Sequence, residues 1–393
     1  MREPHAVAMS RSAERRGEDA MPGPGFSHAI PSIPNPEPSS WGLLGQDAEV
    51  RALARGVAEG QPAHAYLFSG PAQAGKGTLA QRLAQALNCD DPRPLPPDGT
   101  APCGVCRQCR QIEAGTHPDV TVVTLGGLCA RSEHDHGKDG SKDIRVCQVR
   151  ALEERINRSP FQGRWRVEIV DPADTLNAVA ADAFLKTLEE PPARVVLLLL
   201  TAREEALPET VRSRLRRVAV QPVPAEPLAA FLVDRGTEPG EAALLARLSR
   251  GCTGWAIAAA ANRTLLEERA RRLDAIAALS DAGLADRFAA AAQLAQRWSK
   301  DRAGVLAELD LWTEWWRDIA LGAAGAERGI LNVDRLDRIR ALAAGTTPMA
   351  VARAAEAVRA CRTHLEENAN ARLALEVMML RVAGREQGTG NRE

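Results

Sequence analysis

The sequence predicts an α/β module, with a parallel sheet covered by helices, followed by a small all-α domain and a second all-α domain. Two observations predict this fold class. Between Trp41 and about Val220, short and strongly apolar segments alternate with helical ones, which is the pattern of a buried parallel sheet. After Pro222, Pro224 and Pro227 no strand pattern follows, and apolar residues recur at helical spacing.

The elements of the α/β module follow one another in regular alternation. The expected strands span residues 65–69, 120–124, 166–170, 195–201 and 217–220. The expected helices span residues 48–58, 77–87, 144–157 and 177–189. In the all-α part, four apolar residues recur at i, i+3, i+4 and i+7 and predict a core or subunit-interface face of one helix. They are Trp312, Trp315, Trp316 and Ile319.

Length and composition predict several domains. A chain of 393 residues is too long for one ordinary core. Residues 1–40 are rich in proline, serine and glycine without a periodic apolar pattern, so we expect a disordered leader. We place the α/β domain at residues 41–221, the first helical domain at 222–280 and the second at 281–393.

The composition indicates a cytoplasmic protein without general affinity for nucleic acid or membrane. A formal net charge of −1 attracts neither, so any DNA contact needs a local basic patch or a partner subunit. The N-terminal segment lacks the apolar centre of a secretory signal, and no run approaches the roughly 18 apolar residues of a membrane helix. In a reducing compartment, clustered cysteines favour a metal over disulfides.

A Gly-rich segment after the first expected strand is similar to a phosphate-binding loop. Such loops use glycines so that backbone amides converge on phosphate, a lysine for the outer phosphates and a hydroxyl for magnesium. Gly70, Gly75 and Lys76 match this form, but Gly77 stands where the hydroxyl residue belongs. Thr78 lies about 100° further around the helix, so we expect its hydroxyl to point elsewhere.

The second half of such a site is a strand that ends in two acids, one for magnesium and one for activating water. Asp171 follows the strand 166–170 and fits the metal role, but the next residue is Pro172, which cannot accept a proton. Asp174 lies too far along the chain to replace it. Losing a metal ligand or a general base lowers rates by orders of magnitude, so we expect no intrinsic hydrolysis. The sequence does not exclude weak nucleotide binding through Lys76.

Four cysteines downstream of the loop have the spacing of a zinc site. Cys89 ends the helix after the loop, and Cys103, Cys106 and Cys109 form a C-x2-C-x2-C run. Four thiolates complete the tetrahedral coordination of zinc and leave no position open for water. We therefore expect a structural zinc rather than a catalytic one.

A second group of possible ligands lies in or beside residues 126–142, a segment rich in Gly, Ser, Asp, His and Lys that we expect to be a flexible surface loop. Irregular spacing favours an interpretation without metal for this group. Its members are Cys129, His134, His136 and Cys147. Cys252 and Cys361 are expected to be ordinary buried or half-buried thiols.

One arginine is a candidate for acting on a neighbouring subunit. Arg214 lies just beyond a short helix at the sheet edge, where a guanidinium can reach an adjacent subunit's ATP and offset transition-state charge. Arg212, Arg216 and Arg217 lie close by in the sequence, so a solvated basic cluster explains the spacing equally well.

These motifs together resemble the clamp-loader subunits of bacterial DNA polymerase III, most of all the delta-prime type. The resemblance extends from about Trp41 to the C-terminus. It depends on the stretch 64–71, the cysteines after Leu87 and Asn88, the Leu-Lys-Thr-Leu-Glu-Glu-Pro-Pro run at 185–192, and Ser213 with Arg214. The 185–192 run is highly specific to the clamp-loader group.

The resemblance implies an AAA+ module with zinc at 89–109, a helical lid at 222–280 and a helical collar at 281–393 that joins five subunits in a ring. Gamma or tau and delta subunits would be its partners, and the ring would place a sliding clamp on primed DNA within the replisome at the nucleoid. The family's Ser-Arg-Cys arginine serves a neighbour's ATP; here the motif ends in Leu215 but keeps Arg214. The family's nucleotide-sensing lid arginine is replaced by Gly254.

We therefore expect a non-hydrolysing subunit of the DNA polymerase III holoenzyme that contributes Arg214 in trans, holds structural zinc, and binds ATP or ADP weakly or not at all. One alternative is a gamma/tau-like subunit with its own ATPase activity. Another is a stand-alone zinc-dependent nucleic-acid-binding module. The balanced charge and the lack of interleaved basic and aromatic residues around the cysteines argue against the second alternative.

Overall fold

The computed structural model describes residues 41–127, 129, 136 and 141–382. The predicted leader at residues 1–40 lies outside this part of the chain. Contacts group the chain into two compact units. The first holds Asp47–Ser69 and Gly77–Ala219, and the second holds Gly70–Lys76 and the chain from Val220 onward, with short pieces of the segment before Asp47 in each.

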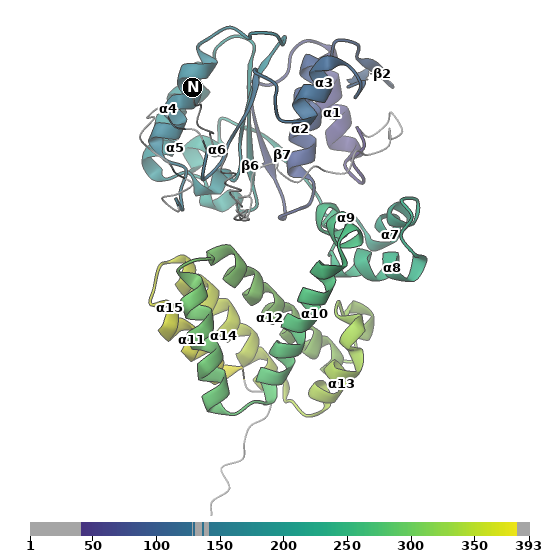
Figure 1. The fold of residues 1–393 in the computed structure, drawn as a ribbon, viewed down its shortest axis with the longest axis vertical. Helices are drawn as coiled ribbons and strands as arrows, with labels where there is room; N and C mark the ends of the chain where they lie inside the picture. Colours follow the sequence, from purple (N-terminus) through teal and green to yellow (C-terminus); the bar gives the residue numbers. More distant parts are fainter. Residues whose placement is uncertain (1–40, 128, 130–135, 137–140, 383–393) are drawn as a thin grey trace, which may run out of the picture. The chain divides into compact units, whose positions relative to one another are not determined.

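A five-stranded parallel sheet forms the centre of the first unit (Figure 1), in the order β4-β5-β6-β1-β7. The central strands consist almost entirely of buried residues, which explains their continuous apolar sequences. Because all strands are parallel, Ser69 at the end of β1 lies beside Thr201 and Ala219. The strands are β1 Ala65–Ser69, β4 Val120–Val123, β5 Arg166–Val170, β6 Val195–Thr201 and β7 Arg216–Ala219.

Helices cover both faces of the sheet. Figure 1 shows α4 and α5 on one face and α1 and α2 on the other. The sequence did not predict α3 or a small antiparallel hairpin between α2 and α3, because both are too short to show a period. The hairpin strands are β2 Arg93–Leu95 and β3 Gly99–Ala101. The helices are α1 Asp47–Ala58, α2 Lys76–Asn88, α3 Arg107–Glu113, α4 Val146–Ile156, α5 Ala178–Glu189 and α6 Glu209–Arg212.

The described residues beyond Val220 form helices and short 3-10 turns, without a strand. Three short helices pack around Leu228, Leu232 and Leu245. Longer helices pack around a second core that contains the tryptophan face of α12. The helices are α7 Ala225–Val233, α8 Pro239–Leu248, α9 Thr253–Ala261, α10 Arg263–Asp281, α11 Leu284–Trp298, α12 Arg302–Ala323, α13 Leu336–Ala344, α14 Pro348–Glu366 and α15 Ala371–Arg381.

The predicted fold class is confirmed, since a helix-covered parallel sheet precedes a series of helices. Three central strands have the bounds that the sequence predicted, and the helix bounds differ by one or two residues. The face formed by Trp312, Trp315, Trp316 and Ile319 is core, with no more than 1% of each residue exposed. Among the described residues, no helix combines the length and the apolar character needed to span a bilayer.

A buried carboxylate stabilises the turn that leads into β5. Asp119 accepts hydrogen bonds from the backbone amides of Phe161, Gln162 and Gly163 at 2.7–2.8 Å and lies 3.0 Å from the guanidinium of Arg166. Burial raises the pKa of Asp119, but the three amides and Arg166 outweigh burial and hold this pKa below its usual value of 3.8. The ionised form is therefore the one that the fold stabilises.

Replacing Asp119 with asparagine is expected to lower the free energy of unfolding by about 3–5 kcal/mol at pH 7, since Arg166 then stays buried without its counter-ion. The pKa of Asp119 is lowered in the folded state, so its contribution is complete above pH 3.8 and is lost as the pH falls through the folded-state pKa. Urea unfolding at a series of pH values should show the difference between parent and variant shrinking below pH 3.8. A difference independent of pH would contradict this account.

Candidate functional site

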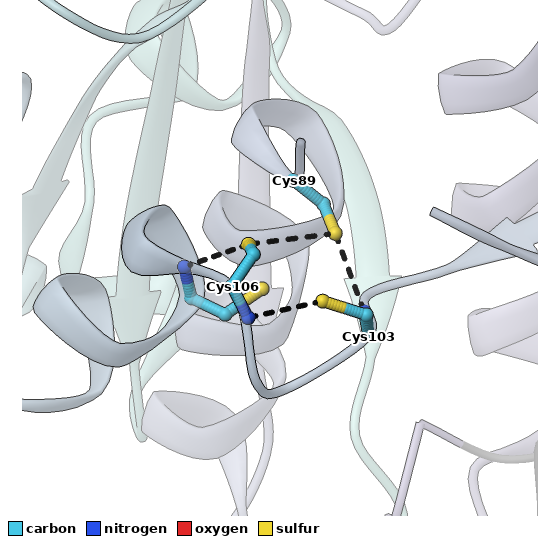
Figure 2. Close-up of side chains that lie close together, drawn as sticks. Cys89, Cys103 and Cys106 are labelled. Carbon is cyan, nitrogen blue, oxygen red and sulfur yellow. Dashed lines mark hydrogen bonds between the residues drawn. The ribbon is translucent and has the colours of Figure 1, made fainter. Parts of the chain in front are cut away.

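Four cysteine sulfurs converge where α2 ends and α3 begins. The sulfurs of Cys89, Cys103, Cys106 and Cys109 all lie within 4.8 Å of one another. Figure 2 shows Cys89, Cys103 and Cys106 turned toward each other, with 3.9 Å between the sulfurs of Cys89 and Cys106. Cys89, Cys103 and Cys109 are buried, and Cys106 is half-buried. The structure therefore brings together all four residues predicted as zinc ligands.

Local backbone geometry positions these sulfurs. The amide of Cys103 donates to the sulfur of Cys89, and the amide of Cys106 donates to that of Cys103, both at 3.3 Å. Cys106 is the N-cap of α3, and its sulfur accepts from the amide of Cys109 at 3.4 Å. Gln85 on α2 is fully buried and donates to the carbonyl of Cys109 at 2.9 Å, which fixes α3 against α2.

The charges of this cluster fit a divalent cation. Burial raises the pKa of the Cys89 thiol to about 11 and also raises that of Cys109. Burial likewise opposes ionisation of Cys106, but the amides of Cys109 and Asp90 and the neighbouring thiols bring its pKa down to about 7. Four thiolates in one largely buried cluster are unfavourable without a cation, and Zn²⁺ is an ion that four sulfur donors bind well.

A second cluster joins three ligand atoms in the first unit. Cys129, His136 and Cys147 have their ligand atoms within 4.8 Å of one another. The irregular spacing in the sequence did not predict this proximity, because spacing indicates which side chains meet only within regular structure. His134, the fourth residue of this group, lies outside the described residues.

The Gly-rich loop follows β1 and leads into α2. Gly70 has φ 154°, and a side-chain Cβ there would lie 2.2 Å from the carbonyl oxygen of Val220, so this position requires glycine. Gly75 precedes Lys76, the first residue of α2. The ammonium of Lys76 is buried and donates to the carbonyls of Gly70 and Pro71 at 2.8 and 2.7 Å. The lysine side chain therefore lies against the loop that precedes it.

Gly254, the second residue of α9, touches this loop. The amide of Gly254 donates to the carbonyl of Gln73 at 2.8 Å, and a Cβ on Gly254 would lie 2.8 Å from the same oxygen. A side chain at this position would therefore displace the loop. The contact gives a steric reason for glycine at this position.

The acids after β5 have separate roles. Asp171 is half-buried, and its amide donates to the carbonyl of Val123 at 3.0 Å. Asp174 accepts from the hydroxyl of Thr201 at 3.0 Å and pairs with Arg203 at 3.1 Å. Through these contacts, Asp174 holds the segment after β5 against the end of β6. Thr78 is half-buried in the first turn of α2, one residue beyond Gly77.

Arg214 follows α6 and is partly exposed. Its guanidinium lies 2.7 Å from the carboxylate of Glu189 and 2.7 Å from the carbonyl of Thr210. Glu189 ends α5 and belongs to the 185–192 run. The side chains of Arg214 and Glu189 are 36% and 52% exposed, so the pair lies at the surface where another protein can reach it. The sequence did not predict this partner, because the pairing depends on how α5 and α6 pack.

Two sequence profiles of known protein families match this chain. The sequence profile described as "DNA polymerase III, delta subunit" matches residues 45–224. The profile "DNA polymerase III, delta subunit, C terminal" matches residues 264–384. The two ranges together cover most of the chain.

Three curated relatives illustrate the range of similarity. The delta' subunit of Bacillus subtilis is 26% identical over 85% of this chain and 95% of its own length. The delta' subunit of Pseudomonas aeruginosa is 37% identical over 46% of this chain and 51% of its own length. The tau subunit of Salmonella typhimurium is 36% identical over 44% of this chain, which spans only 24% of the tau sequence.

Proposed function

Because this chain belongs to the DNA polymerase III delta-subunit family, we propose that it is the delta-prime-type subunit of a clamp loader. In this role it does not hydrolyse ATP itself. It contributes Arg214 to the ATP site of a neighbouring gamma or tau subunit and takes part in loading a sliding clamp on primed DNA.

One observation carries this proposal: the parts needed for hydrolysis are missing, whereas the arginine that would act in trans is present. Gly77 offers no hydroxyl to magnesium, and Pro172 offers no base. Gly254 packs against the loop in place of a sensing side chain. Arg214 stays on the surface of the α/β unit. A gamma/tau-like ATPase would need the first three and is therefore the less favoured assignment.

The full-length match to a delta' relative supports the same assignment. The Bacillus subtilis protein aligns over nearly its whole length, while the tau relative aligns over about a quarter of its own. An alignment over nearly all of a delta' protein supports the delta-prime role better than an alignment over about a quarter of tau does.

An exposed apolar stripe on α15 supports a role in subunit assembly. Leu373, Val377 and Leu380 recur at i, i+4 and i+7 on α15 and are 60%, 38% and 51% exposed. An apolar stripe of this kind is typical of a helix that packs against another protein. We propose that residues 281–393 form the collar that joins neighbouring subunits, that residues 222–280 form the lid, and that residues 41–221 form the nucleotide-binding-like domain.

We further propose that Cys89, Cys103, Cys106 and Cys109 hold one structural zinc ion. The geometry and buried sulfurs of this cluster support it. Gly70, Gly75 and Lys76 would cradle a nucleotide only weakly. The loop lacks the magnesium ligand, which Thr78 would not replace, and Asp171 alone would face the metal from the end of β5.

The purified chain with magnesium and ATP is expected to show no hydrolysis above background. The reason is that both the metal-binding hydroxyl and the general base are missing, and each contributes orders of magnitude to the rate. A coupled phosphate-release assay measures this, with an assembled loader as the positive control. Robust turnover that disappears in Lys76→Ala would favour the gamma/tau-like alternative.

Co-purification from native cells should recover gamma or tau together with delta.

A further inference from the structure

The cluster of Cys129, His136 and Cys147 lies apart from the four-cysteine cluster and is held by different elements. Cys147 is the second residue of α4, whereas the four cysteines lie around α2 and α3. The Nε2 atom of His136 lies 3.4 Å from the sulfur of Cys147, and all three ligand atoms are within 4.8 Å. His136 is only 2% exposed, and the two thiols are half-buried.

A rigid frame supports this cluster. Gln148 is fully buried beside Cys147 and donates to the carbonyls of Thr124 at 2.7 Å and Gly127 at 3.4 Å. Its side-chain oxygen accepts from the amide of Arg145 at 3.1 Å. These bonds tie the chain that leaves β4 to the start of α4, which brings Cys129 and Cys147 together.

The segment before α4 is fixed on its other side as well. The amide of Ile144 donates to the carbonyl of Thr175 at 2.9 Å, and the amide of Asn177 donates to the carbonyl of Ile144 at 3.2 Å. Cys147 therefore lies on a helix whose start is held from two directions. A ligand placed on such an element can hold its geometry when a metal binds.

The chemical types of the three ligands select the metal. Two thiolates with one imidazole are ligands that suit zinc, whereas magnesium and calcium prefer oxygen. His136 places an imidazole nitrogen next to the sulfur of Cys147, as a mixed sulfur and nitrogen site requires. Three protein ligands leave one position of a tetrahedron for water or another small ligand.

We propose that Cys129, His136 and Cys147 form a second zinc site, which fixes the chain after β4 onto the start of α4. This site lies beyond the carboxyl end of β4, at the edge of the sheet where β5 also ends before Asp171. The proposal does not depend on the proposed function, because it concerns metal content and not ATP.

Metal counting on the full chain tests this proposal. Protein purified from zinc-supplemented cells, without added chelator, should contain two zinc ions per chain by plasma mass spectrometry. Cys147→Ser should contain one. The matched control is Cys252→Ser, which removes another half-buried thiol outside both clusters and should keep two. Circular dichroism verifies that each variant folds.

A second measurement keeps the proposal testable if Cys147→Ser does not fold. Cobalt replacing zinc in the parent should give the thiolate charge-transfer bands of two sites, and His136→Gln should change the weaker, two-thiolate contribution while the four-thiolate bands persist. One zinc per parent chain, two zinc ions retained in folded Cys147→Ser, or a disulfide between Cys129 and Cys147 in the parent would each overturn the assignment.

Discussion

Replacing Arg214 with alanine is expected to lower hydrolysis at the neighbouring subunit's ATP site by about 10³-fold or more in a reconstituted loader. An arginine contributed in trans offsets the charge that develops on the transferred phosphoryl group, and alanine cannot supply this charge. The DNA-stimulated turnover of the whole assembly should fall by the share that this one site carries. Steady-state phosphate release, with and without primed DNA and clamp, measures the loss.

The fold should tolerate this change. The ion pair of Arg214 with Glu189 lies at the surface, and exposed pairs of this kind contribute little to stability. The variant should therefore unfold at the same urea concentration as the parent and still join the ring. Loss of activity without loss of assembly separates a role in the chemistry from a role in packing.

Two further variants distinguish a specific role of Arg214 from a general effect of positive charge. Arg216→Ala removes an exposed arginine on β7, two residues away, and should leave turnover unchanged. Arg214→Lys keeps the charge but loses the planar fork that binds two phosphate oxygens, so an intermediate rate is expected. If Arg214→Ala and Arg216→Ala behave alike, the basic-cluster interpretation is correct and the trans role is wrong.

The sheet could be predicted from the sequence because its strands are buried on both faces. Continuous apolar runs such as the one in β6 leave few alternatives, and the bounds of β1, β5 and β6 agree with the prediction. The helix α3 and the hairpin of β2 and β3 could not be predicted in this way. Seven residues make two helical turns, and three-residue strands show no alternation.

Some of the candidate sites could also be predicted from the sequence, and others could not. The four-cysteine cluster was predictable because its C-x2-C-x2-C spacing is itself a local geometry. The cluster of Cys129, His136 and Cys147 was not, because its proximity depends on Gln148 reaching back to the chain after β4. The partner of Arg214 could not be predicted either, because Glu189 comes from a different helix and the pair depends on tertiary packing. Local spacing predicts local sites, and tertiary packing decides the others.

Replacing Cys106 with serine is expected to remove one zinc ion per chain and to destabilise the first unit, while leaving the cap of α3 in place. Cys106 is the N-cap of α3, and serine is among the best N-cap residues, so its hydroxyl can accept from the amide of Cys109. Cys106 is also the least buried of the four cysteines, so the hydroxyl stays near water. What serine cannot provide is the fourth thiolate.

The consequence of losing that thiolate follows from the buried sulfurs that remain. Cys89 and Cys109 are fully buried, and without a cation their thiols return to the neutral form that burial favours. Zinc binding of a structural site contributes directly to folding, so the melting temperature of the first unit should fall and proteolysis should reach the hairpin of β2 and β3. Zinc analysis, thermal melting and limited digestion with proteinase K measure these effects, with Cys252→Ser as the thiol control. A variant that keeps the parent's zinc content and melting temperature would show that Cys106 is not a ligand, because the cap alone cannot explain retention of the metal.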